Sequence, residues 1–249
     1  MKRSDTVMNK PFSSNFLKII AIISMTIDHI GVTLIYPAFI DECMVSGIDL
    51  PGDMMPFEAK KLYYLYIATR LIGRIAFPIF AFMIAEGAFK TSDIKKYLSR
   101  LLLFAFLSEI PYDLATNGRI FDIGSQNIFW TLSAGLAVIM FIKNRTEMNR
   151  SRTVFLTVVL CTVSVFLSFS IGGILLIVSM YIFRYDRKRL VPSVLITTLL
   201  MTLTSSYLQL FSLAAYPLFC LYNGKRGKGN KFLFYAYYPI HLLILYFIA

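Results

Sequence analysis

Charged residues are absent from two long stretches of the chain, residues 153–183 and 190–222, and both stretches are dominated by apolar side chains. A helix crosses the hydrocarbon core of a membrane with about 20 apolar residues. Each stretch is therefore either one overlong span or two short spans joined by a tight turn. Basic residues lie on both sides of each stretch, namely Arg150, Arg152, Arg184, Arg187, Lys188, Arg189, Lys225, Arg226, Lys228 and Lys231.

These basic clusters distinguish the two possibilities. Lysine and arginine residues next to membrane spans concentrate on the cytoplasmic side. A single span over each stretch would place neighbouring clusters on opposite sides of the membrane, whereas a hairpin keeps all of them on one side. The pattern therefore predicts a helical hairpin in each stretch.

The remaining apolar segments predict five more helices, at about 16–39, 62–89, 98–115, 128–142 and 232–249. With the N-terminus in the cytoplasm, twenty Lys and Arg residues fall in cytoplasmic segments, and only Lys60, Lys61 and Arg119 fall outside. We therefore predict an all-α, polytopic transmembrane helical bundle with about nine spans and an exterior C-terminus. Pro78 is expected to bend the second helix.

The composition agrees with a membrane protein, because 57% of the residues are hydrophobic and 16% are charged, against about a quarter charged in soluble domains. The net charge of +11 follows the topology, so we expect no nucleic acid partner. One domain, residues 1–249, should lie in the bacterial plasma membrane as a multi-pass protein. The exterior segment 40–61 is predicted to be a polar loop, and the glycine-rich, basic segment 223–231 a cytoplasmic turn.

Several ionisable residues lie inside the predicted spans, although each costs about 2.5–3.5 kcal/mol to insert. They are Asp28, His29, Arg70, Arg74, Glu86, Glu109, Asp113 and His241. The two arginines are four residues apart and share a helix face, as do Glu109 and Asp113. Two arginines that face two carboxylates would simply lock two helices together. Structural pairing and a functional role both remain open for these four residues.

His29 is the strongest candidate for chemistry. Histidine is the side chain best suited to accept and return a proton near neutral pH, and the two histidines of the chain both fall within predicted helices. Lys18 lies eleven residues earlier, on nearly the same helix face and about 16 Å closer to the cytoplasm. Together they could hold the two ends of an elongated anion. Nothing in the spacing of the cysteines and histidines predicts a metal site.

The spacing from Lys18 to His29 resembles the basic-x10-His motif of the integral-membrane acyltransferase superfamily. More closely, five segments resemble the TraX family, which is named for the acetylation of F-pilin. They are LKIIAIISMTIDHIG (17–31), RLIGRIAFPIFAFMIAEG (70–87), SEIPYD (108–113), QNIFWTLSAG (126–135) and YYPIHL (237–242). The resemblance extends over most of the chain.

This resemblance implies transfer of an acyl group, and specifically an acetyl group, from cytoplasmic acyl-CoA to an amine or hydroxyl at or beyond the membrane. It makes His29 the catalytic base, with Glu109 or Asp113 as groups that could orient its imidazole, and Asp28 as a further candidate. Residues implied in holding the donor or the acceptor are Lys18, Arg70, Arg74, Asn127 and His241. A pilin, a surface glycan and a lipid are all compatible acceptors, and an acyl-histidine relay is an alternative to direct transfer.

Two other classes of function fit the buried charges. A proton-coupled transporter would also place His, Asp, Glu and Arg at mid-membrane, although the sequence contains no inverted repeat that we can detect. A non-catalytic assembly factor would use the same charges only for pairing.

Overall fold

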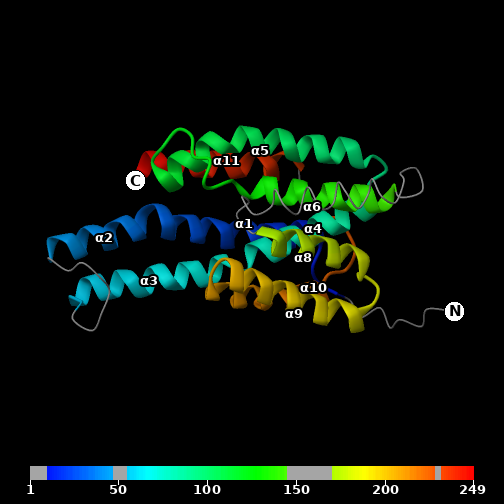
Figure 1. The fold of residues 1–249 in the computed structure, drawn as a ribbon, viewed down its shortest axis with the longest axis horizontal. Helices are drawn as coiled ribbons and strands as arrows, with labels where there is room; N and C mark the ends of the chain where they lie inside the picture. The colour runs from blue at the N-terminus through cyan, green and yellow to red at the C-terminus, as the bar shows by residue number, and fades with distance from the viewer. Residues whose placement is uncertain (1–9, 47–54, 145–169, 228–230) are drawn as a thin grey trace.

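The structure of the protein is a computed structural model that describes residues 10–46, 55–144, 170–227 and 231–249 (Figure 1). Within these ranges the chain folds into helices, with one isolated β-bridge between Phe12 and Tyr222. The predicted all-α class is therefore confirmed. The helices are α1 (Ser14–Ile30), the π-helix η1 (Gly31–Ile35), α2 (Tyr36–Val45), α3 (Phe57–Gly73), α4 (Ala76–Lys90), α5 (Ile94–Asn117), α6 (Ile128–Lys143), α8 (Ser170–Ile182), α9 (Arg187–Thr204), the 3-10 helix η3 (Tyr207–Ala215), α10 (Tyr216–Cys220) and α11 (Lys231–Ile248).

The first helical rod is longer than predicted. It runs without interruption through α1, η1 and α2, and its 32 residues span about 48 Å at 1.5 Å per residue, against about 30 Å of hydrocarbon. Figure 1 shows α2 and α3 projecting together beyond the rest of the bundle. Phe39 of α2 packs against Tyr63 of α3 with ring centroids 5.6 Å apart. The prediction of a polar loop over 40–61 is therefore wrong at both ends, although residues 47–54 lie outside the described residues.

The second predicted helix, 62–89, is divided into α3 and α4 by a turn at Arg74 and Ile75. Pro78 has no N–H with which to bond the carbonyl of Arg74, four residues earlier, and its ring crowds that carbonyl. The predicted bend is thus a break. It lies at the level where Arg74 meets the buried polar groups of α1.

Basic ends of the helices gather at one end of the bundle. Lys143 Nζ, at the end of α6, donates to Thr91 O before α5 over 3.3 Å, and Arg184 after α8 bonds Glu86 of α4 over 2.6 Å. Tyr222 Oη, on the far side of the uncharged run 190–222, lies 3.3 Å from the same Glu86. That run therefore leaves this end and returns to it, as predicted, and its returning half is the 3-10 helix η3 followed by the short α10 rather than a second long α-helix. The other hairpin is predicted over residues 153–183, and residues 153–169 of it lie outside the described residues.

The segment 223–227 also lies at this basic end. The carbonyls of Lys225 and Arg226 accept hydrogen bonds from the backbone N–H groups of Ser14 and Asn15, at 2.9 and 3.0 Å. These are among the first N–H groups of α1, which have no partner within the helix. The predicted turn therefore also fastens the start of α1.

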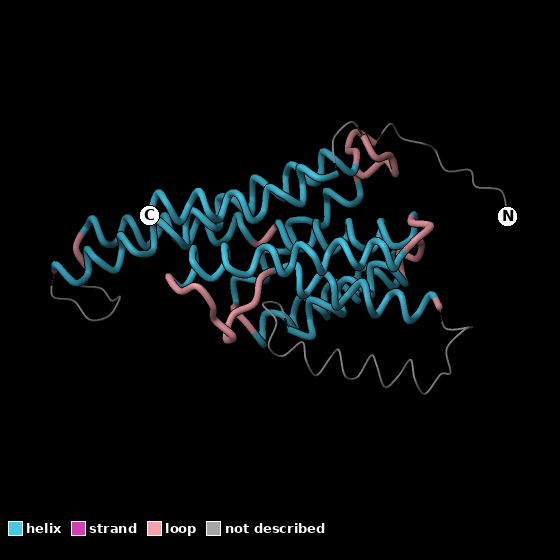
Figure 2. Tube along the Cα trace, turned by 90° about the horizontal axis from the view of Figure 1, so that it is seen from above, coloured by secondary structure: helices cyan, strands magenta, loops and turns pink. Residues whose placement is uncertain are grey.

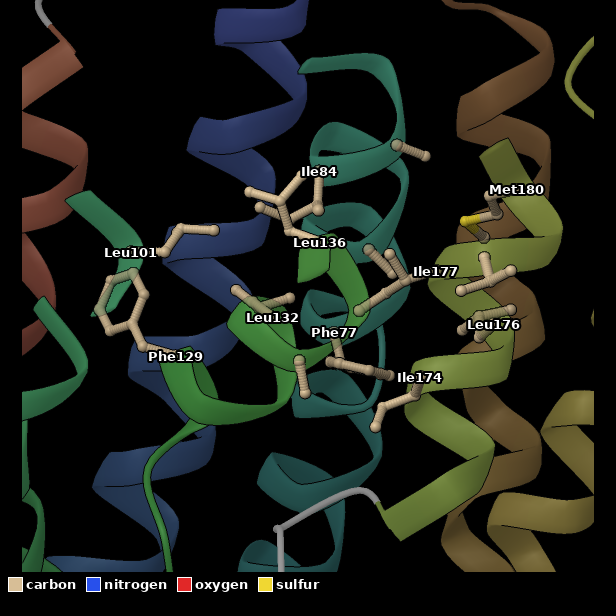
Figure 3. Packing of buried hydrophobic residues seen from close by; sticks show 14 of the residues in the cluster. Phe77, Ile84, Leu101, Phe129, Leu132, Leu136, Ile174, Leu176, Ile177 and Met180 are labelled. Atoms are coloured by element: carbon tan, nitrogen blue, oxygen red, sulfur yellow. The ribbon is translucent and has the colours of Figure 1, made fainter. Parts of the chain in front are cut away.

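The main apolar core is formed by α4, α5, α6 and α8 (Figure 3). Leu136 of α6 and Ile177 of α8 are fully buried there. A Cβ at Gly135 would lie 2.6 Å from the Ile177 side chain, so the absence of a side chain allows α6 and α8 to pack closely. Met25 of α1 and Leu242 of α11 also belong to this core, so it fixes the positions of those two helices.

Two stretches of the described chain, Ser14–Val45 and Phe57–Lys90, are long and apolar enough to cross a membrane, and α11 and α6 are shorter apolar helices. Large apolar side chains also point outward, as at Ile196 and Phe247. Figure 2 shows the C-terminus toward the end where the long helices project, away from the end at which α1 begins. The molecule is a helical membrane bundle.

Candidate functional site

Asp28 binds two arginines at the centre of the bundle. Its Oδ2 accepts from Arg70 Nη1 over 2.7 Å, and its Oδ1 accepts from Arg74 Nη2 over 3.1 Å. The proposed pairing of Arg70 and Arg74 with Glu109 and Asp113 is therefore wrong. One carboxylate facing two guanidinium groups leaves the cluster with a net charge of +1.

The close approach of α1 and α3 makes this cluster possible. A Cβ at Gly73 would lie 2.1 Å from Asp28 Oδ1 and 2.4 Å from Asp28 Cβ, so a side chain there would occupy the space of the carboxylate. Arg74, directly after Gly73, bonds the same carboxylate and is 9% exposed. Glycine is required at position 73 because Asp28 packs directly on its Cα.

His29 is partnered by the second histidine of the chain. His29 Nδ1 lies 2.7 Å from His241 Nε2, and His241 Nδ1 lies 2.9 Å from the backbone oxygen of Tyr237. One turn earlier on α1, Thr26 Oγ1 lies 2.7 Å from the hydroxyl of Tyr237. Two side chains of α1 thus meet two side chains of α11. The expectation that Glu109 or Asp113 orients His29 is wrong, since His241 holds this position.

Two cavities lie on either side of the level of His29. The inner cavity, of about 330 Å³, extends toward the basic end and is lined by the basic residues Lys18, Lys90, Arg100 and Arg226, by the carboxylate Glu86 and by further polar and apolar residues. The outer cavity, of about 520 Å³, is lined by Asp28, His29, Arg70 and Arg74 together with polar residues of the α5–α6 loop and the α9–η3 turn. Met25, Phe80, Ile128 and Tyr238 line both cavities, so the two spaces meet at one wall.

Lys18 and His29 occupy the same side of α1, as the spacing predicted. The Lys18 ammonium lies 5.1 Å from the ring centroid of Phe234 on α11, and His29 contacts His241 on the same helix. Lys18 lines the inner cavity and His29 the outer one. From the sequence, Arg100 and Arg226 were identified only as markers of topology, and they line the inner cavity. Tyr237 and Tyr238 were not identified as neighbours of the histidines. The YYPIHL segment indicates these contacts, because Tyr237 and Tyr238 lie four and three residues before His241 and therefore on its side of a helix.

Glu109 and Asp113 belong to a different cluster, between α5 and α6. Glu109 Oε2 accepts from Asn127 Nδ2 and, over 2.9 Å, from Trp130 Nε1. Asn127 also caps α6 by accepting from Phe129 N over 3.0 Å, and Asp113 accepts from Asp122 N over 2.9 Å. Neither carboxylate lines the inner or the outer cavity. These contacts fix the turn between two helices, which is a structural role other than the pairing with Arg70 and Arg74 considered from the sequence.

Glu86 is also held by structural contacts. It pairs with Lys90 over 2.7 Å and with Arg184 over 2.6 Å. The Arg184 guanidinium lies 3.7 Å from the ring centroid of Phe89, a cation–π contact. This ion-pair cluster fastens the α8–α9 connection to α4 at the basic end, and Glu86 and Lys90 are part of the lining of the inner cavity.

The chain is similar to a protein described as probable fimbrial assembly protein FimC, serogroup H1, from Dichelobacter nodosus. The two are 25% identical over 260 residues, which cover 95% of this chain and 96% of the relative. No solved structure matches the chain. The model of the TraX protein family matches residues 13–249. The chain therefore belongs to the TraX family.

Proposed function

We propose that this protein is an integral-membrane acyltransferase of the plasma membrane, which moves an acetyl or other acyl group from cytoplasmic acyl-CoA to an acceptor at or beyond the membrane. One observation carries the proposal. His29 lines the outer cavity, which meets an inner cavity lined by cations along a shared wall. His29 lies on the outer-cavity side of this wall, with its ring centroid 5.9 Å from that of Tyr238, and a base there suits transfer between substrates that approach the wall from its two sides.

The inner cavity fits the donor. Its basic residues lie near the cytoplasmic end predicted from the charge distribution, where Lys18, Arg100 and Arg226 can attract the phosphates of coenzyme A. Deeper in the cavity the lining is apolar, with Met25, Ile84 and Leu132, which suits the pantetheine arm and a short acyl chain. The thioester would reach the shared wall beside His29.

The chemistry follows from the groups that line the outer cavity beside that wall. The acceptor amine or hydroxyl attacks the thioester carbonyl while His29 takes its proton. The carbon–sulfur bond then breaks, and the coenzyme A thiolate takes the proton from the imidazolium. Arg70 and Arg74, whose charges are only partly balanced by Asp28, supply positive charge for the oxyanion that forms during attack.

The acceptor would occupy the outer cavity. Neutral polar residues from two connections line it, including Ser125, Gln126, Thr204, Ser205 and Gln209, and such a lining can bind peptide or sugar groups. The fimbrial assembly name of the relative favours a pilin as acceptor, while a cell-surface glycan or lipid headgroup has compatible chemistry. The lipid bilayer is the other partner.

The same name favours a second candidate, a non-catalytic assembly factor that holds pilin subunits at the membrane. This function would need the exterior surface but no proton acceptor in a cavity. A proton-coupled transporter is the third candidate. Only the acyltransferase leaves a covalent label on an acceptor.

The test uses the full chain in proteoliposomes with labelled acetyl-CoA and membrane material from the source cells. We expect covalent label in that material with wild-type protein and a fall of about 10²–10⁴-fold with His29→Gln, at unchanged folding, because a general base contributes about this factor. Lys18→Glu should raise the acetyl-CoA concentration needed for half-maximal rate, most clearly at low salt. Lys143→Glu is the matched control, since Lys143 lies at the same end outside the inner cavity. Full transfer by His29→Gln would refute the proposal.

A further inference from the structure

The hydrogen bonds around His241 fix where the protons lie on both histidines. A backbone carbonyl can only accept, so His241 Nδ1, 2.9 Å from Tyr237 O, carries a proton and donates it. In a neutral imidazole the other nitrogen is then an acceptor. His241 Nε2 therefore presents a lone pair toward α1.

His29 Nδ1 faces that lone pair over 2.7 Å, so it must be the donor of the bond between the two rings. The ring centroids are 5.0 Å apart and the planes differ by 13°. Stacked faces lie about 3.5 Å apart, so a nitrogen–nitrogen distance of 2.7 Å requires the rings to meet edge to edge. This approach directs the N–H along the line between the two nitrogens.

A second contact holds Tyr237 in place. Thr26 Oγ1 donates its single proton to Ile22 O over 2.9 Å, so it can only accept from the Tyr237 hydroxyl, 2.7 Å away. The Tyr237 ring lies nearly parallel to the His241 ring, at 11° and 5.0 Å. His241 itself is 5% exposed. The His241 ring therefore has one orientation. It is set by the bond to Tyr237 O within α11 and by the neighbouring Tyr237 ring, which Thr26 of α1 holds in place.

From this geometry we propose that His241 is a positioning residue that holds His29 in the tautomer protonated on Nδ1, so that the lone pair of His29 Nε2 is directed away from α11 as the proton acceptor of the outer cavity. The role of this lone pair in catalysis rests on the proposed function, whereas the tautomer does not. The charged and titratable groups around the pair are Asp28, Arg70, Arg74, Tyr237 and Tyr238.

The chain contains two histidines, which makes the tautomer directly measurable. We would label the full chain with ¹⁵N-histidine, place it in lipid nanodiscs at a pH where both rings are neutral, and record ring nitrogen shifts. Difference spectra with His29→Gln and His241→Gln assign each ring. In wild-type protein, His29 should show a protonated Nδ1 and an unprotonated Nε2.

In His241→Ala this preference should be lost, because the free imidazole favours the proton on Nε2. Transfer should fall by about 10²-fold or more, within the range of general base catalysis, with the acetyl-CoA dependence unchanged. His241→Gln retains an oxygen that can accept from His29 Nδ1, and it should keep both the tautomer and more of the activity than His241→Ala.

A wild-type spectrum with His29 protonated on Nε2 would overturn the inference. So would an unchanged His29 tautomer in a folded His241→Ala variant. If His241→Ala fails to fold, the wild-type spectrum still decides. Since the spectrum needs no acceptor, a protein that shows the expected tautomer but transfers no label would refute the proposed function and leave the tautomer assignment intact.

Discussion

Two groups of buried polar residues in this bundle look alike in sequence and differ in their surroundings. The cavity group, Asp28, His29, Arg70, Arg74 and His241, joins α1, α3 and α11, and four of its members line the outer cavity. The carboxylate group, Glu109, Asp113, Asn127 and Trp130, joins α5 to α6 and lines neither cavity. Both groups cross-link helices. Of the two groups, the first presents polar atoms to the outer cavity, and the second reaches neither of the two cavities formed by the described residues.

This difference separates structural from functional polar residues better than residue type does. Glu109 and Asp28 are both carboxylates within helices, yet Glu109 accepts from an amide and an indole, whereas Asp28 faces two cations beside a cavity. Substitutions in the carboxylate group should therefore change stability alone. Substitutions in the cavity group should change stability, activity or both.

Asp28→Ala should have the largest effect on stability. Removal of the carboxylate leaves two partly buried guanidinium groups without their partner, and breaking a buried ion pair costs about 3–5 kcal/mol. Thermal unfolding in detergent micelles would measure the loss, and Asp28→Asn, which keeps an acceptor, should lose less. Wild-type stability in Asp28→Ala would mean that this ion pair does not hold α1 to α3.

Glu109→Ala should have an intermediate effect. Asn127 Nδ2 and Trp130 Nε1 lose a shared acceptor, and an unsatisfied buried donor costs about 1–3 kcal/mol. Transfer per folded molecule should stay at the wild-type level, because Glu109 reaches neither cavity. Glu109→Gln is the control that retains one acceptor. A stable Glu109→Ala protein without transfer activity would instead support the catalytic role first expected from the sequence.

Tyr237→Phe should have the smallest effect. It removes one hydrogen bond to Thr26 and keeps the ring beside His241, so the expected cost is about 0.5–1.5 kcal/mol. A double-mutant cycle with Thr26→Val would isolate this bond, because the two losses should not add if the side chains interact. Strict additivity would show that the contact contributes nothing to the pairing of α1 and α11.

The sequence by itself determined the helical membrane fold and the reversal of the chain within residues 190–222. Both depend on local properties, which are long apolar stretches and the position of basic residues beside them. It also determined that Lys18 and His29 share a helix face, because helical periodicity sets this relation without any other part of the chain. The break near Pro78 follows from the chemistry of proline in the same local way.

Only the tertiary structure decided which polar side chains pair between helices. Arg70 and Arg74 can pair with any carboxylate at similar depth, and the choice of Asp28 depends on the close approach of α1 and α3 at Gly73. His241 lies 212 residues from His29 along the chain, and no local pattern specifies that their rings meet. Hydrogen bonds and ion pairs between helices depend on how the helices pack, and packing is a property of the whole fold.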